Sequence, residues 1–517
     1  MTWSTSIKPA SLRFRSGVNF DGVFLSIVLA ACVLTGCALQ LVLPYQGGDT
    51  KSPSREYEVK AARHYPPALY PQVENAGFYA HNTTWYVISA YIDMRPERFG
   101  ALPALTFLSA GPSEGVKQRR TLFARVFSQS NGAVIALLEC STSGFDGQHH
   151  HDTQHAVTSV ICSTGSSWIA FKRLADKPLD ACLQLDPKAF CDIASRVPIG
   201  TPQNYPLPLL PQQDIALCIP GVRGDIYRKS FRFFTDHYSS LRVDSIFVYM
   251  TRPGYDLAQE IENAAARSKP RLVILPWCMQ RGASYKCKPG QPVIQNARWF
   301  GFAGTNFGQL LMHQDCLFRS IGAYRWVLFV DLDEYIVPMT STTANLHDLA
   351  LASYAVGDDP PAEIVIRSAF YESCLPDQRD HPSVALSANV DATALPDLPA
   401  PLWSAARVSE IFSKGTWRTK FMCDPLGCDR LGVHFALSMF CQRYPNVTTS
   451  ACKSVEVPIT AGVVHHARAA SSVHGEPLAC SDVNGIQEID WTLTNRALKI
   501  VDRMADDQFI VPLFSRD

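Results

Sequence analysis

The sequence lacks an excess of charge of either sign. Its 517 residues contain 47 Lys and Arg against 47 Asp and Glu, and charged residues make up only 18% of the chain. A chain balanced in this way has no overall field that would draw it to nucleic acid or to an anionic surface. We therefore expect no nucleic-acid partner. Its length, with 47% hydrophobic residues, is typical of two or three globular domains.

Long apolar runs are equally scarce. Residues 22–43 are the one stretch that is uncharged and long enough to cross a bilayer core, at about 1.5 Å per helical residue. We expect a transmembrane signal anchor here, preceded by a cytoplasmic tail at residues 1–21. Basic residues lie on both sides of the run, so they do not fix its orientation. A rival interpretation stays open, because residues 34–37 (LTGC) look like a bacterial lipoprotein cleavage box.

Cysteines and glycosylation signals indicate the compartment. Fourteen of the 16 cysteines follow the expected anchor, and so do both N-x-S/T sequons, at Asn82 and Asn446. This distribution is typical of an oxidising, glycosylating compartment. We expect a single-pass type II protein of the Golgi membrane, anchored by the N-terminal helix, with its catalytic domain in the lumen. The cysteine pairing does not follow from spacing alone.

Proline content and strand patterns divide the rest of the chain. Residues 44–78 are polar and rich in proline, which predicts a stem. Residues 79–205 hold short β-like runs without helical periodicity, which predicts a β-rich accessory domain, a sandwich, that helps to bind a glycan acceptor. Residues 206–517 alternate strands with helices and predict a parallel α/β domain. Candidate sugar-stacking residues on the accessory domain are Trp85, Tyr86, Tyr91 and Trp168.

The alternation in the second domain places individual elements. Strands are expected at residues 215–219, 245–249, 272–275 and 326–330, and helices around residues 227–240, 256–267 and 307–322. The last of these strands, WVLFV, has no polar position, which is typical of burial on both faces of a parallel sheet. Ligands of such sheets bind at the carboxyl ends of the strands.

Three carboxylates follow that last strand: Asp331, Asp333 and Glu334. Side chains on an extended segment repeat every second residue, so we expect Asp331 and Asp333 on one side and Glu334 on the other. Two converging carboxylates repel each other unless a cation neutralises them, and their oxygens suit Mn²⁺ or Mg²⁺. The alternative is that the D-x-D only ends a strand and begins a turn.

Six motifs make the chain resemble glycosyltransferase family 92, whose members carry a GT-A fold. The motifs are YVISAYIDMR at 86–95, GQLLMHQDCLFR at 308–319, WVLFVDLDEYIVP at 326–338, RTKF at 418–421, GVH at 432–434 and HAR at 466–468. Their order and spacing are specific, whereas each alone is weak. One departure is Ala467, which stands where the family has the aromatic residue of a His-Tyr-Arg motif.

This resemblance implies both a fold and an activity. The implied fold class is α/β: a GT-A, Rossmann-like nucleotide-sugar-binding domain, preceded by the β-rich domain and the N-terminal transmembrane helix. The implied activity is inverting, metal-dependent transfer of a hexose, typically galactose from UDP-galactose, to a glycan acceptor. A glycoside hydrolase fits less well, because its two carboxylates flank the bond from opposite sides. A catalytically inactive, membrane-anchored carbohydrate-binding protein remains an alternative.

The resemblance also implies a metal centre. Asp331 and Asp333 are expected to hold Mn²⁺ or Mg²⁺ on the donor diphosphate, where the cation offsets the charge on the leaving group. Either His434 or His466 is expected to be the C-terminal histidine that returns to the metal, and each could instead be a core histidine. Glu334 either contacts the site or supports its loop.

Further candidates concern the donor and the acceptor proton. We expect three basic side chains to bind the donor diphosphate. Three residues on one face of the helix before the D-x-D strand are expected to face the nucleotide, although that helix face could instead be exposed to solvent. In addition to Asp331, these donor-binding candidates are Arg418, Lys420, Arg468, Gln309, Asp315 and Arg319. Inversion needs a general base, for which Glu410 ranks before Glu372 and Asp377.

Overall fold

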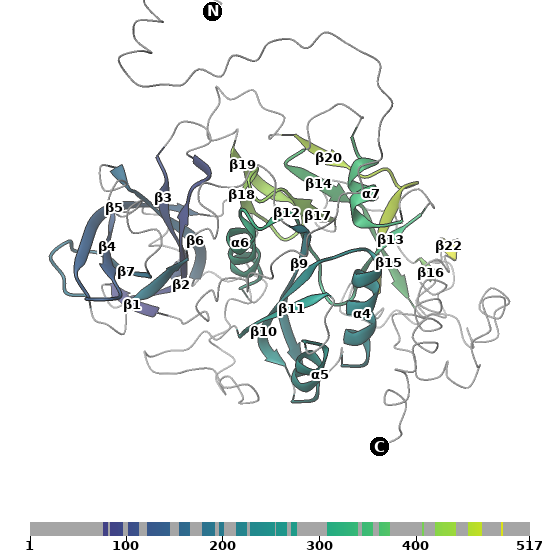
Figure 1. Cartoon of the computed structure of the whole chain (residues 1–517), viewed down its shortest axis with the longest axis horizontal. Coiled ribbons are helices and arrows are strands. Elements are labelled where there is room, and N and C mark those ends of the chain that lie inside the picture. The colour runs from purple at the N-terminus through teal and green to yellow at the C-terminus, as the bar shows by residue number, and fades with distance from the viewer. Residues whose placement is uncertain are drawn as a thin grey trace, which may run out of the picture. The chain divides into compact units, whose positions relative to one another are not determined.

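The computed structural model contains 22 strands and four helices within the residues that it describes (Figure 1). These residues are 76–80, 83–96, 102–112, 121–144, 155–165, 178–191, 196–200, 213–224, 228–253, 255–265, 270–276, 308–339, 344–354, 361–372, 406–407, 419–440, 453–467 and 488–489. The part of the chain from Tyr65 to Asp517 forms one compact unit.

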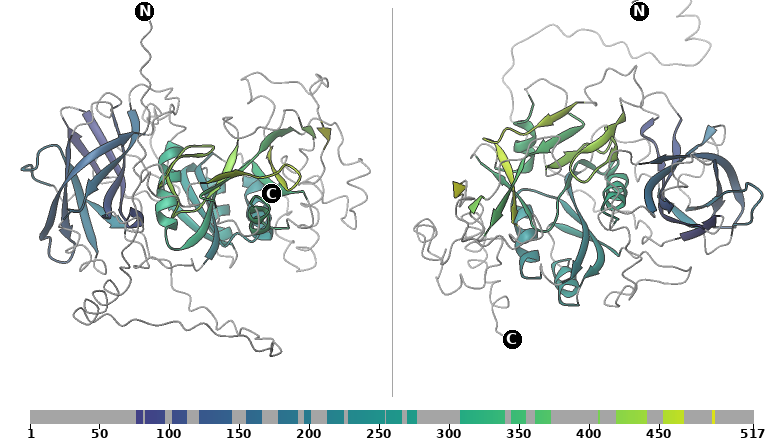
Figure 2. Two further views of the ribbon diagram at one scale, coloured as in Figure 1. Left: turned by 90° about the horizontal axis from the view of Figure 1, so that it is seen from above. Right: turned by 180° about the vertical axis from the view of Figure 1, so that it is seen from behind.

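The N-terminal strands of this unit form a closed barrel. They are β1 (Ala76–Ala80), β2 (Thr83–Asp93), β3 (Ala104–Pro112), β4 (Leu122–Ser128), β5 (Val134–Gly144), β6 (His155–Ser163), β7 (Leu179–Gln184) and β8 (Val197–Gly200). Their order is β1-β2-β3-β6-β5-β4-β7-β8, and β8 also pairs with β2, so the strands from β2 to β8 close a ring (Figures 1 and 2). The β2–β8 pairing closes the sheet on itself, which does not happen in an open sandwich. The prediction of a sandwich is therefore wrong.

Alternation of side chains fills the barrel. In β4, Leu122, Ala124 and Val126 are fully buried and pack in the barrel core, whereas Phe123 and Arg125 between them are partly exposed. This period of two is what one buried face of a strand requires. The described residues between 76 and 200 are therefore mainly β-strands.

A second, mixed sheet carries the C-terminal half. Its strands are β9 (Gln213–Gly224), β10 (Ser245–Pro253), β11 (Arg271–Pro276), β12 (Tyr324–Phe329), β14 (Glu363–Ile366), β17 (Lys420–Cys423) and β20 (Ser454–Glu456), in the order β11-β10-β9-β12-β17-β14-β20. The first four strands in that order are parallel, whereas β17 runs antiparallel to both β12 and β14.

Two smaller sheets and four helices complete the described residues. One sheet has the order β13-β21-β15-β16-β22, and β18 pairs with β19. These strands are β13 (Glu334–Pro338), β15 (Ser368–Glu372), β16 (Ala406–Arg407), β18 (Cys428–Leu431), β19 (Ala436–Met439), β21 (Gly462–Ala467) and β22 (Glu488–Ile489). The helices are α4 (Arg228–Ser240), α5 (Tyr255–Ala265), α6 (Gln309–Ser320) and α7 (Leu346–Leu351).

The two faces of the mixed sheet pack against different helices. Ile215 and Leu217 of β9 belong to a core cluster with residues of α4, α5 and α7. Ala216 and Cys218 of the same strand belong to another cluster, with residues of α6 and of barrel strands β2 and β3. Because both faces are covered, the segment of β12 from Trp326 to Phe329 has no polar position, as the run at residues 326–330 predicts.

The predicted fold class is nevertheless wrong. The expected strands and helices of the parallel part are present as β9 to β12 and α4 to α6. However, the described residues are mostly strand, since a closed barrel precedes the mixed sheet and the C-terminal half adds antiparallel strands to it. A chain with this content is not a Rossmann-like α/β protein. The alternation of strands with helices, which predicts an α/β fold, extends only to residue 330. Neither the barrel nor the strands after β12 follow it.

No helix in the described ranges is long and apolar enough to cross a membrane. The span expected at residues 22–43 lies outside those ranges.

Four disulfides lie within the described residues. They are Cys140–Cys162, Cys182–Cys191, Cys218–Cys316 and Cys423–Cys428. The first joins directly opposed residues of β5 and β6, and the third ties β9 to α6. Eight of the 14 cysteines that follow residue 43 are therefore paired within the described residues.

Candidate active site

The acidic motif lies where β12 ends, at the carboxyl edge of the parallel strands. The backbone N–H of Val330 still donates to Cys218 of β9, at 3.3 Å. The chain then turns, and the N–H of Glu334 donates to the carbonyl of Asp331 at 3.1 Å before β13 begins. Asp331 and Asp333 therefore do not lie on one continuous strand. The expectation that strand alternation puts them on one side does not apply to a turn.

Two side chains from distant elements hold Asp331. Gln309 Nε2, on the first residue of α6, donates to Oδ1 at 3.1 Å. Lys420 Nζ, on the first residue of β17, donates to Oδ2 at 2.8 Å. The Asp331 side chain is still 35% exposed, whereas that of Lys420 is only 2% exposed. The carboxylate is thus fixed from inside the protein and open on its outer side.

Glu334 supports the turn from within. Its side chain is buried, and Oε2 accepts the N–H of Asp331 at 2.7 Å and lies 2.9 Å from Lys420 Nζ. Tyr238 of α4 donates its hydroxyl to the Glu334 carbonyl at 2.8 Å. Of the two interpretations of Glu334, its contacts favour support of the loop.

His466 is the histidine that the structure brings to the acidic residues. It lies opposite Glu334 in the β13–β21 pair. Its Nε2 lies 3.4 Å from Asp333 Oδ2, and its Nδ1 lies 3.5 Å from Glu334 Oε1. Lys420 and His466 therefore alternate with Asp331, Glu334 and Asp333, so each basic group lies between two acids.

His434 is placed differently. Its Nδ1 bonds to the carbonyl of Thr419 at 2.9 Å, which requires the N–H on that nitrogen and leaves the lone pair on Nε2. Burial, followed by the charge of nearby Lys420, lowers its pKa to about 3. His313, four residues after Gln309, is a further neutral histidine: burial lowers its pKa to about 4, and its Nδ1 donates to Gly432. His313 lies within the motif at residues 308–319, but the spacing of that motif gives it no role.

Opposed charges set the protonation of the central groups. Burial works against the Lys420 ammonium, but Asp331 and Glu334 outweigh it and raise the lysine pKa. Burial likewise disfavours the Asp331 carboxylate, yet Lys420 lowers its pKa below the ordinary value. At neutral pH this pair is therefore an ammonium beside a carboxylate.

Glu334 and His466 shift in the same direction for different reasons. Burial raises the pKa of Glu334 despite the charge of Lys420. For His466, burial alone would lower the pKa, but the Glu334 and Asp333 carboxylates outweigh it and raise the pKa. Glu334 and His466 therefore each bind a proton more tightly than a free glutamate or histidine side chain does.

Two predicted donor-binding residues lie elsewhere. Asp315 and Arg319 of α6 are buried and form an ion pair at 2.6 Å. Asp315 also accepts the hydroxyls of Tyr91 from β2 and Tyr249 from β10. The side chains that bond to the Asp315 carboxylate are all buried. Of the three residues expected to face the nucleotide together, only Gln309 contacts the acidic motif.

The remaining candidates cannot be placed. Glu410, Asp377, Arg418 and Arg468 lie outside the described residues, and for Glu372 only the backbone of β15 is described. Of the stacking candidates, Tyr91 is buried and is not a surface platform. Trp168 and the side chains of Trp85 and Tyr86 lie outside the description.

Residues 294–506 match the family model described as glycosyltransferase family 92. All residues of the acidic motif, together with Gln309, Lys420 and His466, fall within this match. The match supports a glycosyltransferase. The barrel precedes the matched segment, and no curated protein matches the chain.

Proposed function

We propose that this glycosyltransferase is an inverting enzyme that transfers a hexose, with UDP-galactose as the favoured donor, to a glycan acceptor. The observation that carries the proposal is the Asp331 carboxylate, held by Gln309 and Lys420 and 35% exposed at the carboxyl end of β12. Nucleotide ligands of parallel strands bind at this edge. The family match over residues 294–506 supports the same chemistry.

The donor set suits a divalent cation. Within the described residues no group of three or more His, Cys, Asp or Glu side chains forms a metal site. Mn²⁺ and Mg²⁺ nevertheless often bind through one or two carboxylates and complete their shell with water and substrate phosphates. Asp333 Oδ2 and His466 Nε2 lie 3.4 Å apart, and the Asp331 carboxylate, two residues before Asp333, is partly exposed. We propose that Asp333, with Asp331 or His466, would hold a cation, which when bound would act as a Lewis acid on the diphosphate.

Charge supports this assignment. Asp331, Asp333 and Glu334 carry three negative charges when ionised, and Lys420 carries one positive charge. A histidine that coordinates a cation is neutral, so the cation would displace the proton that the Glu334 and Asp333 carboxylates favour on His466. With His466 neutral, two net negative charges remain, which one divalent cation offsets. A donor diphosphate adds further negative charge, so it binds here only where cations accompany it.

The reaction exchanges one bond at the anomeric carbon for another and moves one proton. The acceptor hydroxyl oxygen attacks the anomeric carbon from the face opposite UDP, the bond from that carbon to the diphosphate oxygen breaks, and UDP leaves with the electron pair. The hydroxyl proton passes to a general base. We keep Glu410, Glu372 and Asp377 as the candidates for this base. The role of Gln309 and Lys420 is to hold Asp331 in one orientation throughout.

We also propose that the enzyme works in the Golgi lumen. Four disulfides and two sequons support an oxidising, glycosylating compartment.

A direct experiment is UDP release from a panel of UDP-sugars with Mn²⁺, with and without glycan acceptors. We expect acceptor-stimulated UDP release, fastest with UDP-galactose. Binding of glycans without UDP release from any donor would instead favour the catalytically inactive carbohydrate-binding protein.

A further inference from the structure

Asp331 is held by the first residue of α6 and the first residue of β17. Residues at the end of the barrel strand β2 contact a later part of α6 and the turn after β17. Gln309 begins α6 and Lys420 begins β17, and each donates to one oxygen of Asp331. The barrel residues Tyr91 and Arg95, four positions apart at the end of β2, reach the later part of α6 and the turn after β17.

Tyr91 fixes α6. Its hydroxyl donates to Asp315, and its ring stacks on Phe318, with centroids 5.0 Å apart and planes 6° apart. Both partners lie on α6, and Asp315 lies six residues after Gln309, which is about 9 Å along a helix. The Tyr91 ring also packs closely against Gly200 of β8, where an added Cβ would lie 2.7 Å from the ring.

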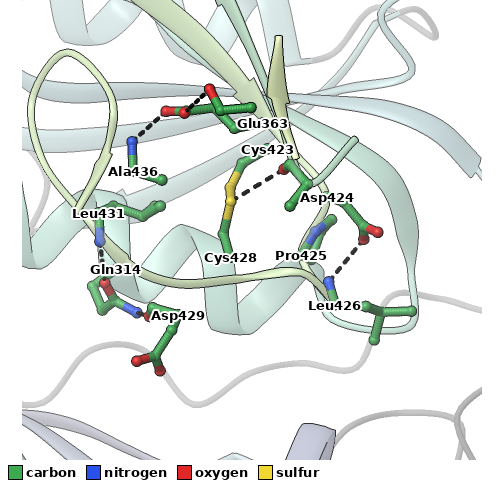
Figure 3. Close-up of a disulfide and its surroundings, with 12 residues drawn as sticks. Gln314, Glu363, Cys423, Asp424, Pro425, Leu426, Cys428, Asp429, Leu431 and Ala436 are labelled. Atoms are coloured by element: carbon green, nitrogen blue, oxygen red, sulfur yellow. Dashed lines mark hydrogen bonds between the residues drawn. A yellow bond between two sulfur atoms is a disulfide. The ribbon is translucent and has the colours of Figure 1, made fainter. Parts of the chain in front are cut away.

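Arg95 fixes the turn that follows β17. Its Nη1 donates to the carbonyl of Pro425 at 3.0 Å and to that of Cys428. The turn between these residues is closed by the Cys423–Cys428 disulfide (Figure 3). Asp93 accepts from Nε and Nη2 of Arg95, each at 2.8 Å, so the guanidinium is fully buried yet neutralised within the barrel.

The two anchors are also joined to each other. The Arg95 guanidinium lies over the ring of Phe318, 5.0 Å from its centroid, on the side chain that Tyr91 stacks against. Gln314 of α6 donates to the Asp429 carbonyl at 2.7 Å and accepts from the N–H of Leu431 at 3.1 Å, which links α6 to the strand after the turn (Figure 3). The barrel therefore holds α6 and the β17 turn as one assembly.

We infer that Tyr91 and Arg95 are positioning residues for the Asp331 carboxylate, so that the barrel is an integral part of the catalytic unit. This inference rests on the proposed function for its consequence in turnover. The physical reason is that Gln309 and Lys420 can hold one carboxylate only while α6 and β17 keep a fixed spacing. A shift of about 1 Å in a catalytic group remote from a mutation is enough to slow a reaction.

The test compares Tyr91→Phe with Thr164→Val. Tyr91→Phe removes only the hydroxyl that Asp315 accepts and keeps the ring on Phe318. Thr164→Val removes a buried hydrogen bond of the barrel, from Thr164 Oγ1 to the Pro103 carbonyl at 2.6 Å, that touches neither α6 nor β17. Amide hydrogen exchange, read by mass spectrometry on peptides that contain residues 309–312 and 331–334, reports on the site whether or not the enzyme turns over.

We expect Tyr91→Phe to speed exchange in both peptides about tenfold, as loss of a hydrogen bond to a charged group predicts, and Thr164→Val to leave them unchanged. In turnover, Tyr91→Phe should lower kcat about fivefold to tenfold while KM for the UDP-sugar stays within about twofold. Arg95→Lys, which keeps the charge but loses the fork, should speed exchange at residues 331–334 in the same way.

A double-mutant cycle separates positioning from general stability. If Tyr91 acts through Gln309, adding Tyr91→Phe to Gln309→Met should change kcat by less than about twofold. Equal exchange in Tyr91→Phe and Thr164→Val, or an undiminished effect on kcat in the Gln309→Met background, would overturn the inference. If wild-type protein releases no UDP, the proposed function fails, and the exchange rates still decide whether the barrel positions Asp331.

Discussion

Lys420 and Asp331 form an ion pair with one interior and one open partner. Their Nζ and Oδ2 atoms are 2.8 Å apart, and the exposed fractions of the two side chains are 2% and 35%. The lysine cannot move to solvent without leaving both Asp331 and Glu334. The pair therefore presents a fixed carboxylate to whatever binds outside it.

Lys420→Met should destabilise the fold severely. The substitution leaves the buried Glu334 carboxylate without its cation, and removal of one partner from a buried pair costs about 3 to 5 kcal/mol of unfolding free energy. Urea unfolding at pH 7 measures the loss. The control is Arg367→Met, which breaks a half-exposed pair with Glu456 and should cost at most about 1 kcal/mol. Equal losses for the two variants would show that the Lys420 pairs do not stabilise the fold.

Asp333→Ala should nearly abolish transfer, by about 100-fold to 1,000-fold in kcat, because the proposed cation would lose one of its ligands. Secretion and the unfolding midpoint should stay close to wild type. The matched control is Asp180→Ala, a barrel carboxylate that accepts from exposed Gln129. EDTA should stop the wild-type reaction, and full turnover in its presence would contradict the metal assignment.

Stability should fall as the pH drops below about 6.5, the ordinary histidine pKa. Burial holds the pKa of His313 at about 4 and that of His434 at about 3. Between these values and about 6.5 the unfolded chain binds protons that the folded chain does not, so each histidine contributes a slope of about 1.4 kcal/mol per pH unit. Its contribution is complete above pH 6.5 and is lost as the pH falls. His313→Gln should reduce the slope of unfolding free energy between pH 6 and 4.5; an unchanged slope would rule out His313 as its source.

Protein made in a secretory host should carry the four disulfides of the described residues, and N-glycans. Peptide mapping without reduction should recover Cys140 with Cys162, Cys182 with Cys191, Cys218 with Cys316 and Cys423 with Cys428. Glycosidase treatment should increase gel mobility through sites at Asn82 or Asn446. Free thiols at these cysteines, together with unaltered mobility, would exclude the lumenal location.

The sequence was most informative where one local pattern decided the structure. The polar-free run at residues 326–330 predicts a strand buried on both faces, and β12 lies in the sheet with helices on both sides. It was misleading where the chain leaves that pattern. Alternation was extended through Asp331 to Glu334, but the chain turns there, and Glu334 becomes an interior partner of Lys420.

Long-range pairs were beyond the reach of sequence spacing. Lys420 is predicted from the sequence to bind phosphate. In the structure it instead donates to Asp331, 89 residues away, and no sequence spacing predicts that pair. Gln309, Asp315 and Arg319 do lie on one helix, α6, but Asp315 accepts a hydrogen bond from Tyr91, 224 residues earlier. Periodicity identifies a shared face and does not say which distant element covers it.

The reach of Arg95 also sets an order of events during synthesis. Its partner Pro425 follows it by 330 residues, which a ribosome needs roughly 15 to 70 seconds to add at ordinary elongation rates. β8, which closes the ring on β2, is made long before that. The nascent barrel can therefore close while the faces of Tyr91 and Arg95 still await α6 and the Cys423–Cys428 turn. During that interval the Tyr91 ring and the Arg95 guanidinium lack the partners on α6 and on that turn that later cover them.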